Sequence, residues 1–248
     1  MEVYFWPFYR GVDIITFLVY DKRVEAGSKI FSNRKLSLRH VFALFSFIFV
    51  VWAIYRYFPE ILPMWVEEII LKPVIWLIPT FWLVRKIERL PLASLGITKA
   101  NLFPSLYWGI GLGMIFSLEG LLTNILKYGG LSLEALQYTP FSFLGAVLLS
   151  LVTALSEELV FRGYIFSRLW QIWKRELLAS IVSAILFAII HLPIGIFVLG
   201  YAPTVMMIFL FLVFIFGIGS AFVFARTGNI ASSILLHVLW SWPIVLFK

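Results

Sequence analysis

Long apolar stretches separated by short polar loops constrain the fold of this chain more than any other feature. A transmembrane α-helix needs about 20 predominantly apolar residues, and seven stretches of roughly this length follow one another along the sequence. They occupy residues 40–58, 69–84, 102–126, 141 to the acid pair at 157–158, 177–199, 204–225 and 229–247. We therefore predict an all-α, polytopic transmembrane helix bundle of about seven spans, within a range of six to eight.

The overall composition excludes a soluble domain. Of the 248 residues, 62% are hydrophobic and only 13% are charged, and there is no long polar stretch that could form a separate domain. We expect one integrated membrane domain in two parts. Residues 1–140 form an N-terminal interfacial segment and three spans, and residues 141–248 form a core of four spans. Residues 3–20 are interrupted by Arg10 and Asp13, which favours an interfacial helix over a span.

The basic residues are concentrated in alternate loops. The loop 21–39 has six Lys and Arg residues and the loop 85–101 has four, whereas the loops on the opposite side have few. By the positive-inside rule, these two loops and the end of the fourth span lie in the cytoplasm. The net charge of +7 therefore indicates membrane orientation and predicts no nucleic-acid partner. The absence of cysteine excludes disulfides, thiolate metal sites and a cysteine nucleophile.

Two adjacent acids interrupt the fourth apolar stretch. Residues 141–152 have no ionisable side chain, and Glu157 and Glu158 then occur together, followed by Arg162. A carboxylate near the bilayer centre costs about 2.5–3.5 kcal/mol on insertion scales, so each acid needs a partner, water or a chemical role. On a helix, Glu158 and Arg162 share a face and can pair, whereas Glu157 lies about 100° away and stays free. The alternative is a buried network that only stabilises the fold.

Two histidines lie within later spans and could share a site with the acids. His191 lies in the fifth span and His237 in the seventh. Each alone is compatible with a simple hydrogen bond between helices. Together with the two glutamates, however, they are nearly all the ionisable groups in this half of the membrane region. In one shared cavity, a carboxylate could take a proton from water, a histidine could orient that water, and a second donor could polarise a carbonyl.

Other intramembrane chemistries lack their motifs in this chain. No His-Glu-x-x-His sequence occurs, and neither histidine has a second ligand three or four residues away, so we predict no metal and no other cofactor. Gly217 and Gly219 precede Ser220 in place of the aspartate of presenilin-like proteases. A dyad of Ser220 with His237 lacks the Gly-x-Ser-Gly motif of rhomboids. Ser220 is better explained as a small residue in helix packing.

The third span contains a further acid and three closely spaced glycines. Glu119 has no partner that the sequence identifies. Gly109, Gly111 and Gly113 predict close contact with another helix, because residues without side chains let two backbones approach.

Three short motifs resemble those of a known family of membrane proteases. Glu157-Glu158-Leu-Val-Phe-Arg162 matches E-E-x-x-x-R, Phe187-Ala-Ile-Ile-His191 matches F-x-x-x-H, and the segment 228–237 is similar to a third motif. In this order they are the motifs of the type II CAAX prenyl endopeptidases and their prokaryotic relatives, the CPBP or Abi family of intramembrane glutamic proteases. The resemblance covers about residues 141–247.

The resemblance implies catalytic roles for the matching residues. Glu157 is the expected general base, His191 is expected to help hold the attacking water, and His237 is expected to face the developing oxyanion. Four residues after this last histidine, where the family has Asn or Asp, this chain has Ser241. Ser241 shares a helix face with His237, so we expect it at the same cavity, with a hydroxyl that acts as a weaker donor or bonds back to the His237 carbonyl. The indole of Trp240 or Trp242 is a further candidate donor. The expected supporting residues are Glu158, Arg162, Phe187 and Asn229.

We predict a metal-independent intramembrane endopeptidase of the glutamic type, which uses a glutamate-activated water to cleave membrane-associated substrates, including prenylated CAAX-type proteins. The competing prediction is a non-catalytic membrane scaffold or bacteriocin-immunity-type protein of the same family, in which the motifs form only a structural network. The expected partners are the lipid bilayer and a peptide or lipidated protein substrate, and no oligomeric state is predicted. The compact chain favours a prokaryotic cell membrane, with an active site reached from the cytoplasmic side.

Overall fold

The computed structural model describes residues 34–58, 62–128, 130 and 140–246, and within these ranges it contains helices and no β-strand. The α-helices are α3 (Arg34–Tyr57), α4 (Met64–Val66), α5 (Lys72–Trp82), α6 (Leu102–Tyr128), α7 (Pro140–Glu158), α8 (Ser167–Trp173), α9 (Glu176–Ile189), α10 (Pro203–Thr227) and α11 (Ile230–Leu246). The π-helical segments are η1 (Glu67–Leu71), η2 (Leu83–Ile87), η5 (Leu159–Phe166) and η6 (Ile194–Val198), and η3 (Leu92–Leu95) is a 3-10 turn. The predicted interfacial helix at residues 3–20 lies outside the described residues.

The π-helical segments join the α-helices into longer rods. The elements α4, η1, α5 and η2 form one rod over residues 64–87, and α7, η5 and α8 form another over residues 140–173. Among the described residues, five helical segments are long and apolar enough to cross a membrane: Ser37–Tyr57, Leu102–Thr123, Leu144–Trp173, Glu176–Val198 and Pro203–Thr227. The rod 64–87, which contains several charges, and the shorter apolar helix within α11 correspond to the other two predicted spans. The predicted helical bundle of about seven spans is therefore confirmed.

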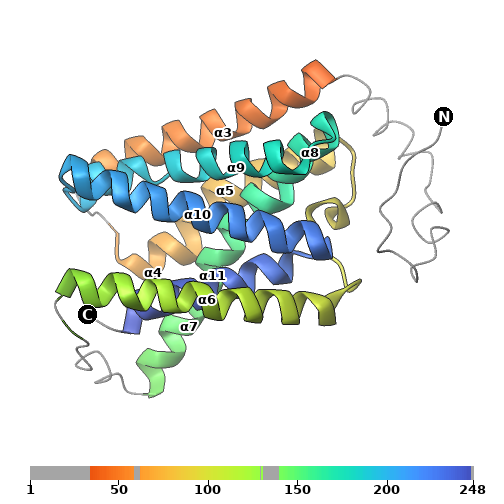
Figure 1. The fold of residues 1–248 in the computed structure, drawn as a ribbon. Coiled ribbons are helices and arrows are strands. Elements are labelled where there is room, and N and C mark those ends of the chain that lie inside the picture. The colour runs from red at the N-terminus through yellow and green to blue at the C-terminus, as the bar shows by residue number, and fades with distance from the viewer. Residues whose placement is uncertain (1–33, 59–61, 129, 131–139, 247–248) are drawn as a thin grey trace.

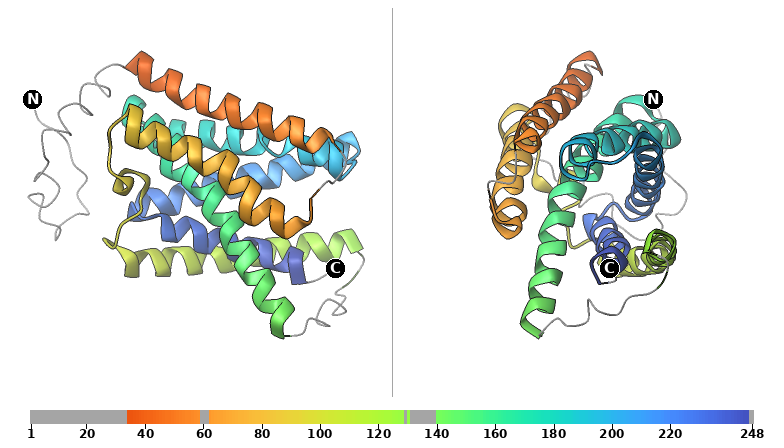
Figure 2. Two further views of the ribbon diagram at one scale, coloured as in Figure 1. Left: turned by 180° about the vertical axis from the view of Figure 1, so that it is seen from behind. Right: turned by 90° about the vertical axis from the view of Figure 1, so that its left-hand side faces the viewer.

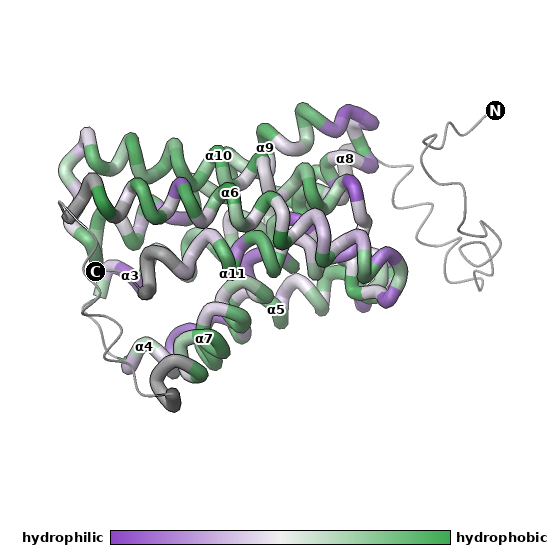
Figure 3. Tube along the Cα trace, turned by 60° about the horizontal axis from the view of Figure 1, so that its bottom comes forward, coloured by the Kyte–Doolittle hydropathy of each residue, from purple (hydrophilic) through white to green (hydrophobic). Residues whose placement is uncertain are grey.

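The polar connections lie together at one end of the bundle (Figure 1). The start of α3, the loop 88–101, the start of α6, the end of α8 and the end of α10 all lie at this end, which we call the basic end. Figure 3 shows hydrophilic positions gathered near α8, with apolar positions along the helices. This arrangement is what the positive-inside rule requires of loops that remain on one side of a membrane.

The oblique helix α7 contacts elements from both parts of the chain (Figure 2). On one side it packs against η1 and α5, and on the other it packs against α11. Helix α3 packs against α5 and α8, so the first part of the chain forms a wall beside the rod that contains the two glutamates.

Helices α6 and α11 pack closely along most of their length. A Cβ atom added at Gly109 would lie 2.7 Å from the Ser232 carbonyl oxygen, and one added at Gly113 would lie 2.7 Å from the Leu239 side chain. At Gly111, a Cβ atom would meet nothing within 4 Å. The prediction of close helix contact is therefore confirmed for Gly109 and Gly113. It is wrong for Gly111, because positions two residues apart lie on nearly opposite faces of a helix.

The loop 88–101 is fastened to the junction between α10 and α11 by Asn229. The side-chain oxygen of Asn229 accepts a hydrogen bond from the Ala231 amide at 2.9 Å, which caps the start of α11. Its side-chain nitrogen donates to the carbonyls of Thr98 and Ala100, each at 2.8 Å. Asn229 therefore holds the helix that contains His237 against the basic end of the bundle.

Candidate active site

Helix α7 places Glu157 and Glu158 on its last turn, where the α-helix changes to the π-helical segment η5. Such π-helical segments occur frequently at functional sites. Adjacent residues on a helix point about 100° apart, so the two carboxylates have different neighbours. Glu158 contacts side chains of α10 and α11, whereas Glu157 contacts a side chain of α5.

The carboxylate of Glu158 is completely buried and has a partner on each oxygen. Oε1 accepts hydrogen bonds from Arg162 Nη1 at 3.0 Å and from His237 Nδ1 at 2.7 Å. Oε2 accepts a hydrogen bond from the Ser220 hydroxyl at 2.6 Å. The predicted Glu158–Arg162 pair is present. Ser220, which was expected as a small residue in helix packing, is fully buried, and its hydroxyl also binds the Glu158 carboxylate.

Glu157 is paired with Lys72, so the expectation that its carboxylate stays free is wrong. Lys72 Nζ donates to Glu157 Oε1 at 2.5 Å and to Glu68 Oε2 at 2.9 Å. Lys72 is 4% exposed and Glu157 is 5% exposed. The other oxygen, Glu157 Oε2, is buried and has no hydrogen-bond partner among the described residues. It lies 3.8 Å from His237 Nε2.

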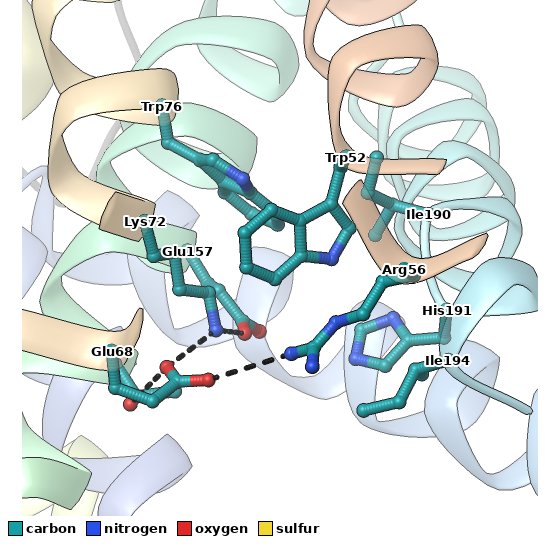
Figure 4. A pocket seen from close by; sticks show the side chains of 10 residues that line it. Trp52, Arg56, Glu68, Lys72, Trp76, Glu157, Ile190, His191 and Ile194 are labelled. Carbon is teal, nitrogen blue, oxygen red and sulfur yellow. Dashed lines mark hydrogen bonds and ion pairs between the residues drawn. The ribbon is translucent and has the colours of Figure 1, made fainter. Parts of the chain in front are cut away.

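A cavity of about 220 Å³ lies beside Glu157. Figure 4 shows the Lys72 ammonium between the carboxylates of Glu68 and Glu157, with the guanidinium of Arg56 next to Glu68. The elements α3, η1 and α5 supply half of the lining, so the first part of the chain helps to build the site. The lining residues are Trp52, Arg56, Glu68, Lys72, Trp76, Thr153, Glu157, Ile190, His191 and Ile194.

His191 lines this cavity in a defined orientation. Its Nδ1 atom lies 2.7 Å from the Phe187 carbonyl oxygen. A carbonyl can only accept a hydrogen bond, so Nδ1 carries the hydrogen, and Nε2 of the neutral ring is an acceptor. The Phe187 ring also meets the edge of the imidazole, with ring centroids 4.8 Å apart. Phe187 therefore orients His191 through both its backbone and its side chain.

His237 approaches Glu157 from α11 and does not line the cavity. Its Nδ1 atom donates to the Glu158 carboxylate, which aims Nε2 toward Glu157 Oε2. The aromatic side chains of Phe216 and Trp240 pack around the imidazole, at centroid distances of 4.8 Å and 6.1 Å. The two glutamates therefore meet opposite nitrogens of one histidine ring.

Ser241 and Trp240 have hydrogen-bond partners away from the cavity. The Ser241 hydroxyl donates to the Val238 carbonyl at 3.0 Å and lies 2.9 Å from the Ser150 hydroxyl. Its bond back to the helix therefore goes three residues back, and not four as expected. The Trp240 indole donates to Glu119 Oε2 at 2.8 Å. Glu119 thus has a partner, and the Trp240 N–H group is already engaged.

Sequence reasoning missed the half of the site that comes from residues before position 140. One signal was available, because Lys72 interrupts an apolar stretch, and an intramembrane cation requires a partner. A second signal was Thr153, which precedes Glu157 by four residues and shares its helix face. These patterns indicate that partners exist, but they do not identify which helices supply them.

The described residues contain no group of three His, Asp or Glu side chains that could hold a metal ion. Metal independence remains a prediction.

The fold and the site define a polytopic membrane protein with acids, histidines and a cavity inside its helical bundle. Residues 139–243 match the family model described as type II CAAX prenyl endopeptidase Rce1-like. This match, over less than half of the chain, confirms the resemblance that the three motifs carry. The chain matches no curated protein and no solved structure.

The matched family is described as one of endopeptidases, that is, of hydrolases that act on peptide bonds. The matched segment begins just before α7 and includes both histidines and both glutamates. It excludes α3 and the rod 64–87, and hence Lys72.

Proposed function

We propose that this protein is an intramembrane endopeptidase in which Glu157 activates the attacking water. The observation that carries the proposal is the position of Glu157 Oε2. This oxygen is buried, has no hydrogen-bond partner among the described residues, and lies 3.8 Å from His237 Nε2. Glu157 itself also lines the cavity. A carboxylate oxygen in such a place can accept a proton from water, which is the task of a general base.

In the proposed reaction, Glu157 and His191 hold one water molecule between them. His191 Nε2 accepts one hydrogen of the water, and Glu157 Oε2 accepts the other. As Oε2 takes its proton, the water oxygen bonds to the carbon of the scissile carbonyl and forms a tetrahedral oxyanion. The carbon–nitrogen bond then breaks, and the leaving nitrogen takes the proton from Glu157. The products are a carboxylic acid and an amine.

His237 is the proposed donor to the oxyanion. Its Nδ1 atom already donates to Glu158, so only the doubly protonated ring can donate a hydrogen bond from Nε2 as well. The Glu158 carboxylate is placed to balance the charge of that ring, and Arg162 fixes the carboxylate in turn. Ser241 is a proposed weaker donor, and its hydroxyl would first have to leave Ser150.

Phe187 and Asn229 are proposed supporting residues. Phe187 sets the orientation of His191 through its carbonyl. Asn229 caps α11 and ties it to the loop 88–101. Neither residue donates to a reacting group in this proposal, so both act through the position of a histidine.

The proposed substrates are membrane-associated peptides, with prenylated CAAX-type proteins as the class that family membership favours. Apolar side chains such as Trp52, Ile190 and Ile194 provide part of the cavity wall that such a substrate would contact. The proposed location is a prokaryotic cell membrane with the basic end in the cytoplasm. Arg56 lies at the end of α3 that is remote from the basic end, so a substrate that enters from the cytoplasm would have to reach beyond the middle of the bundle.

One observation favours a non-catalytic scaffold or immunity-type protein as the second candidate. Glu158 is paired on both oxygens, and Ser241 replaces the family's Asn or Asp and binds Ser150. In that case the polar groups would only hold α7, α10 and α11 together.

Cleavage of a fluorogenic peptide with a farnesylated C-a-a-X terminus, by the purified full chain in detergent, tests the proposal. Glu157→Gln keeps the shape of the side chain and removes the base, so we expect the rate to fall by a factor of about 10²–10⁴. The matched control is Glu119→Gln, which changes an intramembrane acid outside the cavity and should cleave normally. Wild-type cleavage by Glu157→Gln would disprove the role of Glu157. A wild-type chain that is inert on farnesylated and unmodified peptides alike would favour the scaffold.

Chelators test the predicted metal independence. We expect EDTA and 1,10-phenanthroline to leave the cleavage rate unchanged, because the proposed water is held by side chains alone. Loss of activity that is restored by zinc would instead make Glu157, His191 and His237 candidate metal ligands.

A further inference from the structure

A chain of ion pairs connects Glu157 to helices that lie outside the matched family segment. Lys72 Nζ lies 2.5 Å from Glu157 Oε1 and 2.9 Å from Glu68 Oε2. Glu68 Oε1 in turn lies 3.9 Å from Arg56 Nη2. Arg56 also forms a closer ion pair with Glu67. Inside an apolar bundle, an ionic group without a counter-charge is costly, so these paired charges stabilise one another.

Lys72 and Glu68 contact α7 at two positions on one helix face. Lys72 binds Glu157 directly, and Glu68 accepts a hydrogen bond from the Thr153 hydroxyl at 2.7 Å. Thr153 and Glu157 are four residues apart and therefore adjacent on α7. The rod 64–87 is thus attached to α7 at the glutamate and one turn before it.

Two indole rings keep the ammonium of Lys72 at this position. Its Nζ atom lies 5.3 Å from the Trp76 ring centroid and 5.8 Å from that of Trp52. Aromatic faces attract cations, so these two rings help to hold the ammonium. The acids that Lys72 contacts among the described residues are Glu68 and Glu157.

We propose that Lys72 is a positioning residue for Glu157. Lys72 holds Oε1 and keeps the carboxylate ionised, and this leaves Oε2 as the oxygen that takes a proton from water. This inference rests on the proposed function. A buried carboxylate without a counter-ion tends to neutralise itself by binding a proton, and a protonated carboxyl cannot act as a base. The histidines near Glu157 are His237, at 3.8 Å from Oε2, and His191 across the cavity. The other charged groups around it are Arg162, which interacts with it electrostatically, and Arg56 and Glu68 of the cavity lining.

Labelling with dicyclohexylcarbodiimide tests whether Lys72 keeps Glu157 ionised. This apolar reagent reacts with protonated carboxyl groups in membrane proteins. The full chain is treated in detergent at neutral pH, and mass spectrometry measures the adduct on the peptide that contains Glu157. We expect little adduct in the wild type and in Lys72→Arg, and strong labelling in Lys72→Met. The matched control is Lys86→Met, which removes an exposed lysine from the same rod and should resemble the wild type.

Kinetics then test whether the ionised state matters for cleavage. Lys72→Met should lower kcat about 10²-fold, the lower end of the range for a general base, with KM unchanged. Lys72→Arg keeps the charge and should recover most of kcat, which a merely structural loss would not allow. Unchanged kcat in Lys72→Met would overturn the inference.

If Lys72→Met folds poorly, the thermal stability of a double variant and the labelling of the wild type decide the question. The double variant Lys72→Met/Glu157→Gln removes both charges, so its thermal unfolding temperature should lie above that of Lys72→Met alone. Strong labelling of Glu157 in the wild type, or no stability gain in the double variant, would overturn the inference. Labelling does not require cleavage, so it distinguishes this inference from the proposed function, which fails if Glu157→Gln remains active.

Discussion

At the residue scale, the two adjacent glutamates have different proposed roles because they differ in partners. Glu158 has hydrogen-bond donors on both oxygens and fixes the Nδ1 side of His237. Glu157 has a cation on one oxygen, and its other oxygen has no hydrogen-bond donor in the part of the chain that the structure describes. The first arrangement stabilises a fixed geometry, whereas the second leaves one lone pair available for chemistry.

The pairing of Glu158 predicts a large stability loss in Arg162→Leu. Arg162 is 1% exposed, and its removal leaves a buried carboxylate without its cation. We expect the free energy of unfolding to fall by about 3–5 kcal/mol, measured by denaturant or thermal unfolding in detergent. The control is Arg226→Leu, whose ion pair with Glu176 is partly exposed and should contribute no more than about 1 kcal/mol. Equal losses in the two variants would contradict the structural role given to Glu158.

Ser241 is predicted to contribute less to turnover than His237. Its hydroxyl binds Ser150 and a backbone carbonyl, so Ser241→Ala should change kcat far less than His237→Ala. Ser241→Asn places an amide donor on a longer side chain and should raise kcat, because one well-placed oxyanion donor contributes a factor of about 10²–10³. Steady-state kinetics on the farnesylated peptide measures both effects. If Ser241→Ala is as inactive as Glu157→Ala, serine is itself a working donor.

At the element scale, the position of α11 depends on how closely α6 can approach it. Helix α11 contains His237, and α6 packs along it through Gly109 and Gly113. Glycine serves there because the neighbouring backbone or side chain occupies the place of a Cβ atom. The distance between these two helices therefore helps to set the distance between His237 and Glu157.

Alanine substitutions in α6 test this close packing. Gly109→Ala and Gly113→Ala should each lower the free energy of unfolding by about 1–3 kcal/mol, the usual cost of overpacking a close contact. Gly111→Ala is the matched control on the same helix and should be neutral or slightly stabilising, because alanine is the better helix former. Thermal unfolding in detergent compares the three variants. If Gly111→Ala lowered the free energy of unfolding as much as the other two variants do, the loss would not arise from packing against α11.

At the scale of the whole molecule, the site lies between the two parts of the chain. Helix α7 contributes both glutamates, the turn after α9 contributes His191, and α11 contributes His237. Helices α3 and α5 close the opposite side with Lys72 and the two indoles. The family segment alone would leave Glu157 without its cation. We therefore expect the first 140 residues to be required for activity as well as for folding.

The absence of cysteine allows a direct test of membrane orientation. Lys99 lies in the loop at the basic end, and Ala202 lies between η6 and α10 at the other end. Both residues are exposed, and each can be replaced by cysteine. In intact cells, a membrane-impermeant maleimide should label Ala202→Cys. It should label Lys99→Cys only after the membrane is permeabilised. The reverse pattern would invert the orientation predicted from the basic loops.

Local sequence patterns determined the helices and the contacts within them. Apolar runs of suitable length predicted the spans, because the thickness of the bilayer sets the length of a helix that crosses it. The Glu158–Arg162 pair followed from a spacing of four, since such residues are neighbours on any helix. The three motifs also indicated the family whose model matches residues 139–243, because each motif is contained within a short segment.

Only the tertiary structure decided which distant residues meet. Lys72 and Glu157 are 85 positions apart, and Trp240 and Glu119 are 121 apart. An apolar helix surface in lipid has many possible neighbours, and its sequence does not state which of them supplies the counter-charge. The oblique path of α7 brings the rod 64–87 to one carboxylate and α11 to the other. Because of these neighbours, Glu158 has hydrogen-bond donors on both oxygens, whereas Glu157 has one on Oε1 only among the described residues, although the two are consecutive in the sequence.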